Sequence, residues 1–152
     1  MSRTEIVLLY ETLKERSALQ EVQSILSQMG ISFREESLPH SPTLPALRQV
    51  VEGIGQSVCI WAAGRSAYLL PVLSASLTFQ QPLVVIPCPD EKVSLEYLQN
   101  LFEAVQGYPI VFTLPKDTQA AALLAVHLLA ARHPSYADLL YAFLNKRLPQ
   151  PA

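Results

Sequence analysis

The chain has 152 residues, a formal net charge of −2 and only 16% charged residues, against about 25% in an average soluble domain. That length fits one domain, in which a hydrophobic core forms without support from disulfides or metals. The 11 basic and 13 acidic residues include no basic run, which argues against binding to nucleic acid or to an anionic membrane through charge.

Short apolar runs rich in β-branched residues recur along the chain, and each predicts a buried strand. They cover 5–10, 31–35, 58–62, 83–86 and 110–114. The segments between them have the apolar spacing of helices. The first helix ends at Gly30, the second is entered through Thr43 and Pro45, and the fourth starts at Ser94 and ends at Gly107. The remaining helices are predicted over 66–78, 117–132 and 135–146.

Alternating strands and helices require parallel pairing with right-handed crossovers. The predicted fold class is therefore α/β: a three-layer αβα sandwich of doubly wound type, with a parallel five-stranded sheet and an extra C-terminal helix. Residues 1–147 are predicted to form a single domain, and 148–152 a short disordered tail.

The two cysteines, Cys59 and Cys88, have no CxxC spacing, so neither a disulfide framework nor a zinc site is predicted. A reducing cytoplasm is the default location. The longest apolar run, 120–131, has the length of a core helix rather than of a membrane span. With so few charges, the surface is expected to be apolar enough to favour a homo-oligomer.

Glycine is scarce, with 5 residues in the whole chain. Neither GxGxxG nor GK[ST] is present, which excludes the usual dinucleotide and nucleoside triphosphate loops. The ends of the predicted strands carry no pair of carboxylates for magnesium. No cofactor and no metal site are predicted.

Ligands of doubly wound folds bind beyond the carboxyl ends of the strands. After the second predicted strand, Ser37, His40 and Ser41 bring hydroxyls and an imidazole to that edge. His40 is either an acid–base group or an exposed residue of a proline-stiffened turn. After the third strand, Gly64, Arg65 and Ser66 lead into a helix, where they form either an anion site or a plain helix cap.

Several segments carry a family pattern: Ser37 to Pro42, Ala62 to Pro71, Thr78, Pro82, Pro87, Pro109 and the alanine-rich stretch Ala120 to Ala125. Through these segments, which are spread from Ile6 to Lys146, the chain resembles the PurE family. This family comprises the carboxyaminoimidazole ribonucleotide mutases and aminoimidazole ribonucleotide carboxylases of de novo purine biosynthesis. The resemblance implies a flavodoxin-like fold and a homo-octamer with active sites between subunits.

The active-site motifs of the family are largely replaced. The phosphate-binding GSxSD falls on 9–13 and keeps only the hydroxyl of Thr12. The SAHRTP motif falls on 37–42, with Pro39 at the position of the general-acid histidine unless a one-residue shift brings His40 there. Arg65 and Ser66 stand where the family has pocket glycines.

The favoured interpretation is a diverged PurE-like protein that keeps the fold and the assembly but lacks the mutase reaction. It would act as a scaffold or bind a small anion or nucleotide through Thr12, Ser37, His40, Ser41, Gly64, Arg65 and Ser66. One alternative is an active mutase or carboxylase in which His40 is the catalytic residue. Another is a flavodoxin-like interaction module.

Overall fold

A computed structural model of the chain describes residues 5–38, 43–55, 57–64, 82–88, 94–104, 106–107 and 110–147. Within these ranges, the strands and helices follow the predicted order. The first half contains β1 (Ile6–Tyr10), α1 (Leu13–Gln28), β2 (Phe33–Ser37), α2 (Leu44–Ile54) and β3 (Val58–Ala63). The second half contains β4 (Leu83–Pro87), α4 (Leu95–Ala104), β5 (Ile110–Phe112), α5 (Thr118–Arg132) and α6 (Ser135–Arg147). The helix predicted over 66–78 lies outside the described residues, as does the predicted tail at 148–152.

All five strands pair in parallel in one sheet of order β2-β1-β3-β4-β5. Ile6 of β1 lies opposite Phe33 on one side and opposite Val58 on the other. The strand order therefore reverses at β1, as a doubly wound sheet requires. This confirms the predicted α/β class.

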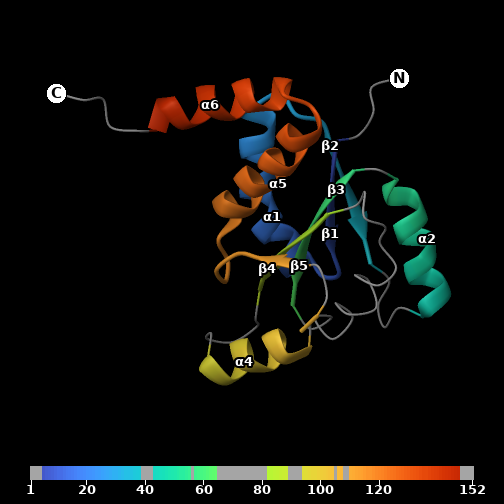
Figure 1. Ribbon diagram of the computed structural model, residues 1–152. Coiled ribbons are helices and arrows are strands. Elements are labelled where there is room, and N and C mark those ends of the chain that lie inside the picture. Colours follow the sequence, from blue (N-terminus) through green and yellow to red (C-terminus); the bar gives the residue numbers. More distant parts are fainter. Residues whose placement is uncertain are drawn as a thin grey trace.

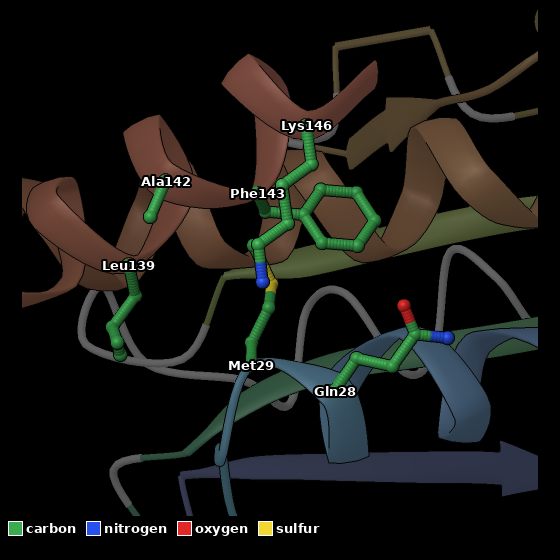
Figure 2. Close-up of a pocket in the computed structure, with 6 residues that line it drawn as sticks. All are labelled: Gln28, Met29, Leu139, Ala142, Phe143 and Lys146. Carbon is green, nitrogen blue, oxygen red and sulfur yellow. The ribbon is translucent and has the colours of Figure 1, made fainter.

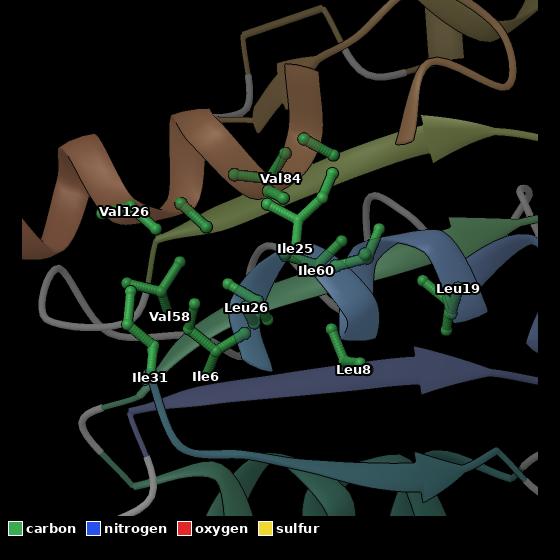
Figure 3. Packing of buried hydrophobic residues seen from close by; sticks show 14 of the residues in the cluster. Ile6, Leu8, Leu19, Ile25, Leu26, Ile31, Val58, Ile60, Val84 and Val126 are labelled. Atoms are coloured by element: carbon green, nitrogen blue, oxygen red, sulfur yellow. The ribbon is translucent and has the colours of Figure 1, made fainter. Parts of the chain in front are cut away.

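Helices cover both faces of the sheet (Figure 1). On one face, Ile6, Leu8, Ile60 and Val84 belong to a buried cluster that includes residues of α1, α5 and α6. Figure 3 shows this packing, with α1 and α5 lying against the strands. On the other face, a second cluster containing Trp61 brings the strands together with α2 and α4. Because a strand's side chains alternate between faces, β1, β3 and β4 contribute to both clusters.

The two outer strands, β2 and β5, differ from the prediction of five buried strands. All five residues of β2 are partly or fully exposed, and Val111 in β5 is 42% exposed. An edge strand has a neighbour on one side only, so its side chains are less covered. In β2 the charged residues are paired, Arg34 with Glu36 and Glu35 with Arg16, a feature that also discourages pairing with another chain's edge.

The end of α1 explains why β2 begins two residues later than predicted. Gly30 has a φ of 70°, and its N–H donates to the Ser27 carbonyl while the Ile31 N–H donates to the Leu26 carbonyl. These two bonds form a Schellman motif, in which glycine accommodates the left-handed backbone. Ile31 is thus a buried residue of the helix cap, and the strand starts at Phe33.

The alanine-rich helix α5 begins at Asp117, whose side chain accepts a hydrogen bond of 3.1 Å from the Ala120 N–H. Its buried residues include Ala121, Ala125 and Val126, which pack against the sheet as the core helix predicted from the sequence. Within the described ranges, no helix combines the length and apolar character needed to span a membrane.

Candidate active-site edge

The carboxyl ends of β1, β2 and β3 lie side by side, because β1 sits between the other two. We call this end of the sheet the carboxyl edge. After β2, the Leu38 N–H donates to the Tyr10 carbonyl at 2.7 Å, and after β4 the Cys88 N–H donates to the Ala63 carbonyl at 2.8 Å. These bonds hold the segments that follow the strands close to one another.

The structure places three of the predicted ligand-binding residues at this edge. Thr12 is the N-cap of α1, Ser37 ends β2, and Gly64 directly follows β3. Thr12 and Ser37 are both exposed. The other predicted site residues, His40, Ser41, Arg65 and Ser66, lie outside the described residues, and their roles stay predictions.

The carboxylate of Glu15 lies at the centre of this edge, although the sequence reading had not selected it. Glu15 is only 3% exposed. Its Oε2 accepts hydrogen bonds from the backbone N–H groups of Thr12 at 2.6 Å and of Glu11 at 3.1 Å. The spacing Thr-x-x-Glu is the capping-box signature, so Thr12 and Glu15 together carried a sequence signal for this contact. Its burial, however, comes from neighbours distant in sequence.

Gly64 is one of those neighbours. A Cβ at residue 64 would lie 3.0 Å from Cδ of Glu15, 3.3 Å from the Cys88 carbonyl oxygen, and in collision with Oε1 of Glu15. From the sequence, this glycine was expected to belong either to an anion site or to a helix cap. In the structure, the group that approaches it closely is the carboxylate of Glu15.

Gly64→Ala is therefore expected to lower the free energy of unfolding by about 1–3 kcal/mol, since the methyl group must displace a bonded, buried carboxylate. Urea denaturation measures the change. Gly53→Ala is the matched control: its Cβ meets only Arg34, with Nη2 at 3.8 Å, and alanine in α2 should stabilise by up to about 1 kcal/mol. If Gly64→Ala and Gly53→Ala changed the free energy of unfolding equally, the result would contradict the close contact of Gly64 with Glu15.

Cys88 borders the edge beyond Gly64. The pKa of the Cys88 thiol is raised to about 11, mainly by burial and also by the nearby Glu15 carboxylate, while Lys116 and Lys14 oppose the rise. Burial also raises the pKa of the Cys59 thiol. Both thiols are thus protonated near neutral pH.

Alkylation of the native protein at about pH 8 is expected to be slow at both cysteines. With a pKa of about 11, Cys88 carries roughly 200-fold less thiolate than an unperturbed cysteine of pKa about 8.5. Mass spectrometry should find the native chain unmodified and both sulfurs modified in urea. A Cys88→Ser variant shows whether any label on the native protein is attached to Cys88. Rapid native labelling that this variant abolishes would contradict the raised pKa.

Arg16 also lies near the edge, with its charge already paired. Its Nη2 is 3.0 Å from Oε2 of Glu35, and its guanidinium lies 5.8 Å from the centre of the Tyr10 ring. The hydrogen bond to Glu35 raises the pKa of Arg16. An anion at the edge would compete with Glu35 for this arginine.

A groove of about 280 Å³ lies far from this edge, where α6 crosses the C-terminal end of α1. Figure 2 shows Phe143 and Lys146 of α6 facing Met29 at the end of α1. This is the amino end of the strands, whereas doubly wound folds bind ligands at the carboxyl end. Among the described residues, no group of three or more histidines, cysteines or carboxylates could hold a metal ion.

Comparison with known proteins relates the whole chain to one family. A sequence model described as AIR carboxylase matches residues 5–148. An N5-carboxyaminoimidazole ribonucleotide mutase of Aquifex aeolicus (strain VF5) is 32% identical over 87 residues, which are 57% of this chain and 51% of that protein. The alignment thus spans about half the length of that relative. The crystal structure of Treponema denticola PurE matches with a TM-score of 0.73 and 16% identity, covering 95% of this chain and 92% of that one. This match confirms the flavodoxin-like, three-layer fold.

Proposed function

Since the chain belongs to the AIR carboxylase family, the PurE family of purine biosynthesis, we propose that it is a diverged member. In this proposal the mutase reaction is lost, and the carboxyl edge binds a small anion other than the family's ribonucleotide. The observation that carries the proposal is the buried carboxylate of Glu15, which occupies the N–H groups of Glu11 and Thr12.

These N–H groups belong to the turn on which the family pattern places its phosphate-binding motif. Free N–H groups at a helix N-terminus attract an anion, but here the Glu15 carboxylate already accepts from them. A phosphate at this turn would face that carboxylate, and two unit charges about 4 Å apart repel by on the order of 4 kcal/mol at an effective dielectric constant of 20. The side chain of Leu9, at the position of the motif's glycine, is fully buried.

The anion would instead contact groups away from this turn. Ser37 and Gly64 are at the edge, and the proposal adds His40, Ser41, Arg65 and Ser66 from the sequence. Hydroxyls, an imidazole and a guanidinium suit a carboxylate or phosphate. His40→Ala and Arg65→Ala should each weaken such binding without changing the midpoint of thermal unfolding.

The reaction itself is the direct test. Purified protein is incubated with N5-carboxyaminoimidazole ribonucleotide, with the Aquifex mutase as positive control, and separately with aminoimidazole ribonucleotide and bicarbonate. We expect no turnover above the uncatalysed rate and no change in melting temperature. Turnover comparable to that of the control would overturn the proposal.

An active mutase or carboxylase is the second candidate, favoured by the 32% identity to the Aquifex mutase. In this candidate His40 donates the proton that carboxylate migration on the imidazole requires. It predicts turnover in the wild-type protein and its loss in a folded His40→Ala variant. Turnover retained by that variant would remove His40 from the mechanism.

Homo-oligomerisation is part of the proposal, with an octamer implied by the family resemblance. Leu13 and Leu95, which begin α1 and α4, and Leu114, which follows β5, are 76%, 82% and 74% exposed. Leucines this exposed are typical of contact surfaces when they gather at one end of a molecule. Light scattering should give a multiple of the 16.8 kDa chain mass. A monomer without ligand would instead favour the flavodoxin-like interaction module.

A further inference from the structure

The strand β5 forms one edge of the sheet, because among the described residues β4 is the only strand that pairs with it. The extended backbone continues past Phe112, where the Thr113 N–H donates to the Val85 carbonyl of β4 at 3.0 Å. The backbone N–H and carbonyl groups of successive strand residues point alternately to the two sides of the strand. Since those of Thr113 point to β4, those of Ile110 and Phe112 point away from the sheet, where a further strand could bond to them.

The side chains beside this edge are apolar on both faces of the sheet. Ile110 and Phe112 pack against the core cluster that contains Trp61. Phe102 of α4 is 50% exposed, and its ring lies edge-on to that of Phe112 with the ring centres 5.5 Å apart. Val111 points to the opposite face by strand alternation and is 42% exposed. Exposed apolar groups therefore border the outer side of β5 on both faces.

The two edges of the sheet differ in charge. β2 carries Arg34, Glu35 and Glu36, all of them in ion pairs, and charged side chains protect an edge against pairing with another strand. The segment 110–114 has the sequence Ile-Val-Phe-Thr-Leu, which contains no charged residue. The β5 edge therefore matches a second uncharged edge better than it matches β2. Another copy of the chain carries such an edge in its own β5.

We propose that β5 pairs antiparallel with β5 of a second copy across a two-fold axis at Val111, so that the two sheets join into one. This register pairs all three residues of β5. Ile110 of each chain lies opposite Phe112 of the other, where the outward N–H and carbonyl groups meet as a hydrogen-bonded pair. Val111 lies opposite Val111 of the other copy as a non-hydrogen-bonded pair, with the side chains in contact. The same surface serves both chains, as a two-fold interface requires.

This inference names one contact of the homo-oligomer in the proposed function and rests on that assembly. It requires neither the loss of the mutase reaction nor the binding of an anion, which turnover and ligand binding test separately. A two-fold contact closes a dimer. A larger assembly would need further surfaces, such as those around the exposed Leu13 and Leu95.

Val111→Lys tests the contact by charge. It places two ammonium groups opposite each other across the axis, and like charges directly opposite destabilise a strand pair. Light scattering over a dilution series should show association at least about tenfold weaker than in the wild-type protein. Val111→Thr, which is β-branched and uncharged, is the matched control and should associate as the wild type does. A folded Val111→Lys variant with wild-type association would overturn the proposal.

Mixing Val111→Lys with Val111→Glu separates loss of the contact from loss of folding. The opposite charges attract each other across the axis, so the mixture should regain the assembly that each variant lacks alone. If the mixture does not assemble while both variants keep the circular dichroism spectrum of the wild type, β5 does not form this pair.

Val111→Cys tests the register. The Cα atoms of a non-hydrogen-bonded antiparallel pair are about 4.5 Å apart, a separation that a disulfide spans. Oxidation in air with copper phenanthroline should therefore give a disulfide-linked dimer on a non-reducing gel. Tyr141→Cys on α6, at a position that is 70% exposed, is the control and should remain uncrosslinked. Equal crosslinking of the two variants would overturn the proposal. A monomeric wild type would overturn it together with the homo-oligomer, and would leave the tests of the mutase reaction and of anion binding unaffected.

Discussion

Glu15→Ala is expected to lower the free energy of unfolding by about 2–4 kcal/mol. The substitution removes the acceptor for two backbone N–H groups, and hydrogen bonds to a charged group contribute roughly 1.5–3 kcal/mol each. Relief from burying a carboxylate offsets part of this loss. Urea denaturation at a fixed chain concentration measures the change, since assembly would make stability depend on concentration.

Glu15→Gln separates the hydrogen bonds from the charge. Glutamine keeps a side-chain oxygen acceptor and nearly the same volume, so the expected loss is below about 1.5 kcal/mol. Glu103→Ala is the exposed control on α4, where the side chain accepts one bond of 3.3 Å from Gln99; its loss should stay below about 0.5 kcal/mol. If Glu15→Ala and Glu103→Ala lower the free energy of unfolding equally, the buried carboxylate of Glu15 does not stabilise the turn.

Glu15→Ala also tests whether the Glu15 carboxylate occupies a position where an anion could otherwise bind. In Glu15→Ala, the N–H groups of Glu11 and Thr12 are released at the N-terminus of α1. Inorganic phosphate should then stabilise the variant, because a ligand that binds only the folded state raises its stability. In the wild-type protein these N–H groups are occupied by Glu15, so phosphate should not add to its stability by binding at this turn. A variant that phosphate does not stabilise would remove the main support for the proposed loss of the family's phosphate site.

Ile60→Ala is expected to destabilise the protein by about 2–5 kcal/mol. Ile60 lies on the central strand β3, is fully buried, and belongs to the core cluster drawn in Figure 3. Its truncation removes apolar contacts with β1, β4 and the covering helices and leaves a cavity that close packing cannot fill. The urea midpoint should fall while the dependence of stability on urea concentration stays unchanged.

A graded series checks that cavity formation is the cause. Ile60→Val removes a single methylene group and should cost about 0.5–1.5 kcal/mol. Tyr141→Ala removes a larger group from a position of α6 that is 70% exposed, and it should change the free energy of unfolding by less than about 0.5 kcal/mol. A cost at Tyr141 as large as that at Ile60 would show that burial does not decide the effect.

Local patterns predicted most of the described elements. The apolar runs at β1, β3 and β4, together with the helix entry at Thr43, sufficed because strand alternation and helix caps depend on residues close in sequence. The prediction was wrong where burial depends on neighbours. β2 was placed two residues early and taken as buried, since the sequence does not reveal that it is an edge strand.

The candidate site was only partly predictable. Parallel α/β folds bind ligands beyond the carboxyl ends of their strands, which predicts a site at the carboxyl edge. Thr12, Ser37 and Gly64 do lie there. The burial of Glu15 was not predicted, because Gly64 approaches its carboxylate only when the sheet forms. Nothing in the spacing of these two residues along the chain signals that contact.

The sequence by itself determined the fold class and the family, because alternating apolar runs allow few topologies and the chain carries one family's pattern over nearly its whole length. Only the tertiary structure decided what occupies the turn after β1. Glu15 is buried there because the end of β3 brings Gly64 against its carboxylate, and a contact across 49 residues forms only when the sheet closes. The scarcity of glycine in the sequence pointed to a missing phosphate loop, and the structure shows the Glu15 carboxylate accepting hydrogen bonds from the backbone N–H groups of the turn after β1.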